Sequence, residues 1–141
     1  MIDLSRFVCS YFVPALYRDE KKLLKSGGIS DTAESVFYLA VRDGKTVGRI
    51  QGIIQKQYNE IHGVSQIRFT RFDCNDDQDV ANALFGAVEA WGRERGMNEI
   101  CGPLGFNDLD REGLLVDGFN ENSTFEEQYN YEYYARLLEN N

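Results

Sequence analysis

Three arginines in the sequence could together bind an anion. Arg49, Arg68 and Arg71 fall in two segments whose composition is typical of neighbouring β-strands. A guanidinium offers a planar fork of N–H donors that matches a carboxylate or a phosphate. Arginines also commonly form the solvated face of a half-buried sheet, and the sequence leaves both interpretations open.

Carboxylates gather just before an amphipathic segment, where they could bind a cation. The pattern Asp73-x-Asn75-x-Asp77 begins like a calcium-binding loop, but Gln78 stands at the glycine position and Leu84 at that of the bidentate glutamate. We therefore expect no metal site. These acids are expected to cap the following helix, whose N-terminus favours negative charge.

The other side chains suited to proton transfer are the only histidine, His62, and a group of tyrosines near the end of the sequence. His62 falls in a polar stretch between two expected strands, where an ordinary exposed histidine is commoner than a catalytic one. The tyrosines could line a pocket, although their helical spacing favours packing against the sheet. The group consists of Tyr129, Tyr131, Tyr133 and Tyr134.

Common nucleotide and nucleophile motifs are missing from the sequence. Gly44-Lys45-Thr46 resembles the end of a P-loop, but Leu39 stands at the first glycine position and the tripeptide lies in an expected hairpin turn. The sequence has no G-x-G-x-x-G and no G-x-S-x-G. It therefore favours neither a dinucleotide-binding fold nor an α/β-hydrolase.

The strongest structural pattern is a β-hairpin. Residues 35–42 and 46–55 are rich in β-branched and aromatic residues, and Asp43-Gly44 between them is typical of a two-residue turn. A polar loop is expected over 58–63, and a third strand over 66–73.

The hydrophobic period then changes to that of an amphipathic helix ending before Gly96, with an apolar face of Val80, Leu84, Val88 and Trp91. A strand over 98–106 completes a right-handed βαβ unit, whose two strands should be parallel neighbours. We therefore expect an α/β fold with a mixed sheet, an antiparallel hairpin plus a parallel βαβ unit, and helices on both faces. The remaining expected elements are a helix between Pro14 and Gly27, a short apolar segment over 113–119 and a helix over 125–139.

Composition indicates one acidic globular domain over residues 1–141. Hydrophobic residues make up 43% of the 141 residues and the formal net charge is −8. No basic stripe is present, so we expect neither nucleic acid nor a membrane surface as a partner. The three cysteines form no C-x-x-C pair and no signal sequence is evident, so reduced thiols and a cytoplasmic location are expected.

Four blocks of the sequence together carry a family resemblance. They are FYLAVRDGKTVGRI, NDDQDVANALFGAVEAWGRERGMNEICGPLGFND, EGLLVDGFN and YNYEYYARLLE. These blocks resemble an uncharacterised bacterial family classed with the GNAT acyltransferases, the N-acetyltransferase superfamily, and the similarity runs from about Phe7 to the end. The resemblance implies the GNAT fold, in which acetyl-CoA or another acyl-CoA lies where the strand at 66–73 splays from the strand at 98–106.

The resemblance also implies which residues hold the acyl-CoA. Backbone groups of Phe72 and Cys74 would bind the pantetheine arm as an added strand does, and Asn107 would face it from the neighbouring strand. The pyrophosphate would lie on the loop that contains Gln78, at the start of the following helix. That loop lacks the glycines of typical members, and its carboxylates would repel a pyrophosphate.

The proton-transfer residues that the resemblance implies are Asp73 and Tyr134. Asp73 would deprotonate a small-molecule amine, and the acids around it would attract a cationic acceptor. In typical members a tyrosine protonates the departing thiolate, but Leu138 stands at that position. Tyr134 lies one helical turn earlier on the same face and is the substitute that the sequence offers.

These departures leave a second function open, that of a GNAT-like module that binds a ligand or a partner without turnover. Family members continue beyond the point that corresponds to Asn141, into a second related half. The sequence is therefore expected to be an N-terminal half or a short relative, and its open sheet edge favours a homodimer or pairing with the missing half.

Overall fold

The computed structural model describes Tyr11, Arg18, Lys21 and residues 32–124 and 127–141. The helix expected between Pro14 and Gly27 lies outside the described residues. The elements, in chain order, are β1 (Ala33–Arg42), β2 (Lys45–Gln55), α2 (Lys56–His62), β3 (Gln66–Cys74), α3 (Gln78–Arg93), β4 (Glu99–Cys101) and α4 (Tyr133–Glu139).

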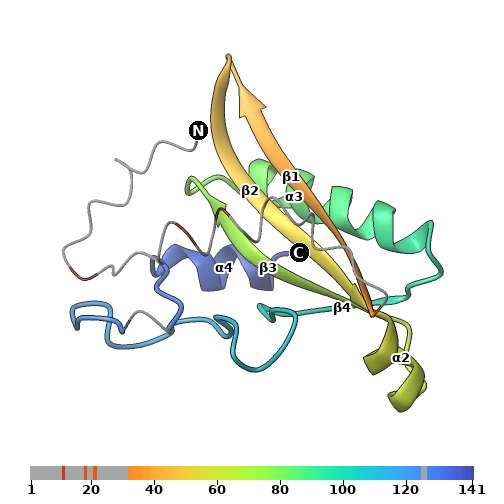
Figure 1. The fold of residues 1–141 in the computed structure, drawn as a ribbon. Coiled ribbons are helices and arrows are strands. Elements are labelled where there is room, and N and C mark those ends of the chain that lie inside the picture. The colour runs from red at the N-terminus through yellow and green to blue at the C-terminus, as the bar shows by residue number, and fades with distance from the viewer. Residues whose placement is uncertain (1–10, 12–17, 19–20, 22–31, 125–126) are drawn as a thin grey trace.

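The sheet confirms the expected mixed α/β class. Its strand order is β1-β2-β3-β4, with antiparallel pairs up to β3 and a parallel pair between β3 and β4. Figure 1 shows α3 lying across one face of the first three strands, and α4 alongside β3. Both helices bury side chains in one core. The expectation of helices on both faces of the sheet stays a prediction.

The β1–β2 hairpin forms as predicted, because its turn matches the twist of the strands. Asp43 and Gly44 have φ angles of 52° and 72°, the left-handed pair that a type I′ turn requires. The strands pair from Ala33 with Gln55 to Arg42 with Lys45, with an irregularity after Ala40.

The core lies between the sheet and the apolar face of α3. The predicted helical period is confirmed, since Val80, Leu84, Val88 and Trp91 are all buried. They pack on Ile50 and Ile54 of β2 and on aromatic residues of β3, where the rings of Phe69 and Phe85 meet edge to face. Burial of these apolar side chains stabilises the fold.

Close approach of α3 explains the glycines of β2. A Cβ atom at Gly48 would lie 2.8 Å from the Cβ of Cys74 and 2.9 Å from the Cδ1 of Leu84. Only a residue without a side chain fits between β3 and the helix at this point.

Gly48→Ala is therefore expected to lower the free energy of unfolding by about 1–3 kcal/mol through overpacking. Gly86→Ala is the matched control, because Gly86 is exposed on α3 and its Cβ would meet nothing within 4 Å. The control should raise stability by about 0.5–1 kcal/mol through helix propensity. Urea denaturation of the two variants would show opposite shifts; a neutral Gly48→Ala would contradict the packing argument.

Three segments differ from what the sequence predicts. The first is the expected polar loop over 58–63. Residues 56–62 form α2, which has no buried residue and ends at Gly63 in the left-handed conformation. The helix has no apolar stripe, so hydrophobic period gave no sign of it. Asn59 fixes it by donating to the carbonyl of Gln66 at 2.8 Å. His62 is exposed, as expected, and its ring lies 4.3 Å from that of Tyr58.

The strand expected over 98–106 is much shorter. β4 ends at Cys101, and it pairs with β3 only from Gln66–Glu99 to Arg68–Cys101. Gly102 then passes directly against the carbonyl of Phe69, and Pro103 has no N–H with which to continue the ladder. One further bond, from the Leu104 amide to the Phe69 carbonyl at 2.8 Å, precedes the point where the two segments separate.

The helix expected over 125–139 begins only at Tyr133. The residues before it are bound to an earlier segment instead. The Asn130 side chain accepts from the Leu115 amide at 2.8 Å and donates to the Leu115 carbonyl at 3.1 Å, while the Tyr129 hydroxyl donates to the Phe119 carbonyl. Residues in the segment expected over 113–119 thus serve as hydrogen-bond partners of the non-helical stretch before α4.

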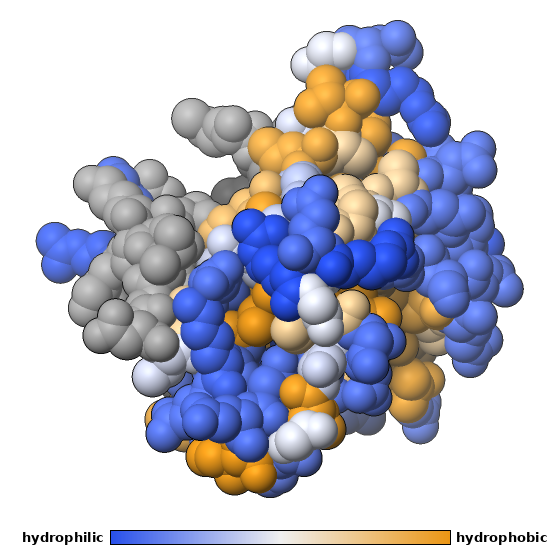
Figure 2. Space-filling view, turned by 90° about the vertical axis from the view of Figure 1, so that its right-hand side faces the viewer, coloured by the Kyte–Doolittle hydropathy of each residue, from blue (hydrophilic) through white to orange (hydrophobic). Residues whose placement is uncertain are grey.

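The surface is mixed in polarity. Figure 2 shows mostly polar surface, with apolar surface near the top, over the β1–β2 hairpin. Leu39 and Val41 of β1 are 58% and 62% exposed. None of the helices in the described part of the chain has the length and apolar character needed to cross a membrane.

Candidate functional site

A β-bulge in β3 sets the direction of the side chains at its carboxyl end. Gln51 pairs with Thr70 and Arg49 pairs with Asp73. Two residues therefore lie between the paired positions on β3, but only one lies between them on β2. The extra residue is Arg71, whose φ of 51° is left-handed. Without the bulge, alternation would direct Asp73 towards α3; with it, Asp73 shares the opposite face with Arg49.

The structure brings together the two predicted proton-transfer residues. Tyr134 of α4 donates its hydroxyl hydrogen to Oδ1 of Asp73, although the two are 61 positions apart in the sequence. The other carboxylate oxygen, Oδ2, lies 3.7 Å from Nε of Arg49. Asp73 therefore has a phenol on one side and a guanidinium on the other, and its own side chain is 15% exposed.

Tyr134 is held in place by packing. It is 3% exposed, and its ring meets those of Phe72 and Tyr133 with centroids 5.5 Å and 4.9 Å away. Burial raises the pKa of Tyr134 far above that of a free phenol, and the negative charge of Asp73 raises it further. Tyr134 is thus a protonated phenol, and its proton is directed at a carboxylate.

Phe72 and Cys74, the predicted contacts of a pantetheine arm, lie beside α4 at the end of β3. Tyr133 donates its hydroxyl hydrogen to the Cys74 carbonyl at 2.8 Å, and burial raises the pKa of Tyr133 to about 12. Burial, with the charge of Asp73 next, raises the pKa of the Cys74 thiol to about 12, so the thiol stays protonated. The side chain of Phe72 is buried against Phe85.

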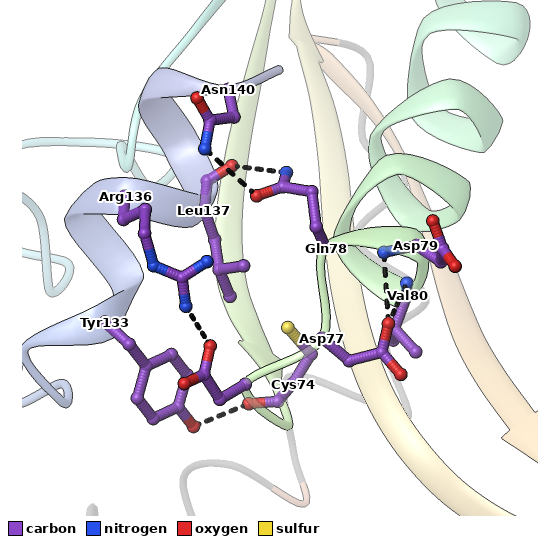
Figure 3. A network of polar contacts seen from close by, with 10 residues as sticks. Cys74, Asp77, Gln78, Asp79, Val80, Tyr133, Arg136, Leu137 and Asn140 are labelled. Atoms are coloured by element: carbon purple, nitrogen blue, oxygen red, sulfur yellow. Dashed lines mark hydrogen bonds and ion pairs between the residues drawn. The ribbon is translucent and has the colours of Figure 1, made fainter.

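The start of α3 binds the chain's own groups, as Figure 3 shows. The Asp77 carboxylate accepts from the amides of Asp79 and Val80, which confirms the expected capping role. Gln78 bridges the helices, because its Nε2 donates to the Leu137 carbonyl at 3.1 Å. Arg136 of α4 pairs with Asp76.

Asp77 should make stability depend on pH. The Arg42 guanidinium, at 2.6 Å, lowers the pKa of Asp77 below its ordinary value, and the Val80 amide adds to this. A lowered folded-state pKa stabilises the fold above the unfolded-state pKa, about 3.9, and this stabilisation is lost as pH falls through the folded-state value. The melting temperature of Asp77→Ala should therefore be lower than that of the native chain at pH 7. The difference between the two melting temperatures should be smaller at pH 3.

Asp77→Asn serves as the control for that experiment, since asparagine is also a good N-cap. At pH 7 its melting temperature should lie between those of the native chain and Asp77→Ala, because it loses only the ion pair with Arg42. If the melting temperatures of the native chain and Asp77→Ala differ equally at pH 7 and pH 3, the stabilising ion pair between Asp77 and Arg42 is contradicted.

Asn107, the predicted contact from the neighbouring strand, lies in an exposed loop after β4. Its side chain accepts from the Leu109 amide at 2.9 Å. The adjacent residues are bound at the amino end of β3, where Arg68 donates to the Gly105 carbonyl and Gln55 to the Phe106 carbonyl. Arg68 and Asp73 are five residues apart on one strand, roughly 16 Å, so Asn107 is not brought to the Asp73 side chain.

Sequence reasoning missed the part played by Gln51. It is fully buried on β2, and its Oε1 accepts from the Arg71 guanidinium at 3.1 Å. A polar side chain within an otherwise apolar stretch of β2 was the available signal.

The site as a whole combines a carboxylate and a phenol in contact, Asp73 and Tyr134, between which a proton can pass. Cationic groups lie on the same face of the sheet as Asp73.

Two curated relatives match part of the chain. It is 35% identical over 111 residues to protein YghO of Escherichia coli (strain K12), which is 77% of this chain and 28% of that protein. It is 37% identical over 97 residues to bacterial ceramide synthase of Caulobacter vibrioides (strain NA1000 / CB15N), which is 68% of this chain and 25% of that protein. The chain thus spans about a quarter of the length of these relatives. No protein-family model and no solved structure matches it.

Proposed function

We propose that this chain is a GNAT-like domain of an N-acyltransferase, which forms an amide from an acyl-CoA and a small amine. The observation that carries the proposal is the hydrogen bond between Tyr134 and Asp73, beside the edge of β3 that β4 leaves after Phe69. A thioester lying along that edge would meet a proton acceptor and a proton donor at one place.

The two side chains suffice for the proton transfers of the reaction. An amine that arrives as a cation first releases one proton to solvent. The neutral nitrogen then forms a bond to the thioester carbonyl carbon while Asp73 takes a second proton from it. The tetrahedral intermediate collapses, the carbon–sulfur bond breaks, and the thiolate takes the Tyr134 proton. The proton on Asp73 then passes to Tyr134 across their hydrogen bond, so the amine's proton ends on the thiol and the site is restored.

The name of one relative supports this reaction class. Ceramide is the amide of a fatty acid with a long-chain amino alcohol, so a ceramide synthase forms an amide bond. A long-chain amino alcohol is therefore the first acceptor to test, and long acyl-CoAs belong beside acetyl-CoA among the donors. The carboxylates from Asp73 to Asp79 would attract a cationic amine to this end of the sheet.

The proposal is tested by titrating the purified 141-residue chain with acetyl-CoA and palmitoyl-CoA in a calorimeter, followed by a thiol-release assay with an amine panel. We expect saturable heat and amine-dependent thiol release. Absence of both heat and a thermal shift at millimolar ligand would overturn the assignment. Desulfo-CoA, which cannot react, serves as the control for binding without turnover.

A second candidate is a GNAT-like module that binds a ligand or partner without catalysis. One observation favours it: the amides of Asp79 and Val80 at the start of α3 already bond to Asp77, where typical GNAT members would bind pyrophosphate. Saturable binding of an acyl-CoA with no thiol release for any amine would select this candidate.

A further inference from the structure

Three buried nitrogen atoms on neighbouring strands have no hydrogen-bond partner. Within the described part of the chain, the buried side-chain polar atoms that lack a partner are Nε of Arg49, Nε2 of Gln51 and Nε of Arg68. All three are N–H donors, and buried donors are almost always paired in folded proteins. The nearest side-chain acceptor among the described residues, Oδ2 of Asp73, lies 3.7 Å from Nε of Arg49, too far for a hydrogen bond. The group is therefore suited to an acceptor from outside the chain.

All three donors lie on the sheet face that α3 does not cover. On β2, Ile50 and Gly52 face α3, so Arg49 and Gln51 face away from it. Arg68 alternates in the same way between Ile67 and Phe69, whose side chains belong to the core. Arg49 and Gln51 are two residues apart, roughly 6.6 Å along the strand, so one small group can lie between them.

The bulge in β3 brings Arg71 to this face, where it positions Gln51. Arg71 has a left-handed φ of 51°, a conformation that a long side chain rarely adopts and that clusters at functional sites. The bulge lets its guanidinium reach Oε1 of Gln51 at 3.1 Å. This bond fixes the Gln51 amide so that Nε2 is the group that remains without a partner.

We propose that this face binds an oxyanion, a carboxylate or a phosphate group, through Arg49 and Gln51, with Arg71 positioning the Gln51 amide and Arg68 at the margin of the site. Guanidinium and amide N–H groups are the donors that such anions match best. Arg49 connects the buried donors to solvent, since its side chain is 35% exposed. The inference does not depend on acyl transfer.

The position of the oxyanion site also indicates what kind of ligand it takes. Nε of Arg49 is only 3.7 Å from a carboxylate oxygen of Asp73, so a bound anion would lie next to a group that attracts a cation. A ligand with both a positive amine and a negative carboxylate or phosphate would satisfy both. Negative charge near the α3 start makes that end of the helix the poorer alternative for an anion.

The test is isothermal titration of the full chain with sodium phosphate and with sodium acetate, at constant ionic strength maintained with chloride. Gln51→Glu replaces the Nε2 donor by an acceptor of the same size and keeps a partner for Arg71. We expect saturable binding of at least one anion by the native chain, and at least tenfold weaker binding by Gln51→Glu. Arg93→Gln is the control, because Arg93 is exposed on α3 and pairs with Glu89. It should bind as the native chain does.

Arg49→Lys keeps the positive charge but removes the guanidinium fork, and it should also weaken binding at least tenfold. This second variant decides the matter if Gln51→Glu does not fold. Absence of saturable heat with both anions would overturn the proposal, as would unchanged affinity in the variants. If the chain also binds CoA, competition between CoA and the bound anion would place the anion on an acyl donor, and binding of both at once would place it on the acceptor.

Discussion

Replacing Asp73 by asparagine is expected to slow amide formation from an acyl-CoA by roughly 10²–10⁴-fold, the usual contribution of a positioned general base. Asparagine has the size of aspartate and its carbonyl oxygen can still accept the Tyr134 hydroxyl hydrogen, so the packing around α4 should persist. It cannot take a proton from the amine. Thiol release would be measured with saturating donor, over a range of amine concentrations.

Tyr134→Phe separates the two halves of the proposed proton path. It removes the hydroxyl that protonates the thiolate but leaves Asp73 and Arg49 in place. Its turnover should also fall, with binding of desulfo-CoA unchanged. Turnover by Asp73→Asn at the native rate would show that Asp73 is not the base. If the same variant still bound acyl-CoA, the proposed donor site would stand.

Asp73→Asn has a readout that does not require turnover. The charge of Asp73 is among the causes that raise the pKa of Tyr134, second to burial. Neutralising it should lower the pKa of Tyr134 towards its ordinary value, which ultraviolet titration of the tyrosines would detect.

Leu137→Ala is expected to produce a large loss of stability, about 2–5 kcal/mol in the free energy of unfolding, because it leaves a cavity under α4. Leu137 is fully buried in the core cluster that also contains Tyr134, one turn away. The helix has only seven residues and depends on this packing, since so short a helix is not stable alone. Denaturation in urea would measure the loss.

Leu109→Ala is the matched control, because Leu109 is 92% exposed. The same chemical change there should alter the free energy of unfolding by less than about 0.5 kcal/mol. Equal effects at the two positions would show that α4 does not pack as the structure has it. If α4 positions Tyr134, acyl-transfer activity in Leu137→Ala should fall even at temperatures where the protein remains folded.

The candidate site was predictable in its residue types but not in its assembly. Asp73 and Tyr134 were named from a family resemblance, and the structure places them in contact. The predicted position of Asn107 required a strand that ends early, at Cys101. Gln51 gave only a weak signal, because one glutamine in a strand is usually a surface residue.

The sequence by itself determined the elements whose signals are local. The Asp43-Gly44 turn aligned β1 with β2, and the 3.6-residue period of α3 determined which of its faces is buried. Both follow from interactions between residues close in the sequence, which hardly depend on the rest of the fold. The mixed α/β class followed from their order.

Only the tertiary structure decided where β4 ends, where α4 begins and which way Asp73 points. The last depends on one extra residue, Arg71, in the pairing of β3 with β2, and adding one residue to a strand of period two reverses the face of every side chain after it. The aromatic spacing over 125–139 fitted a helix, but the residues just before Tyr133 are not helical, and Asn130 and Tyr129 bond to residues 115 and 119 instead. Such contacts join residues far apart in the sequence, so no local pattern contains them.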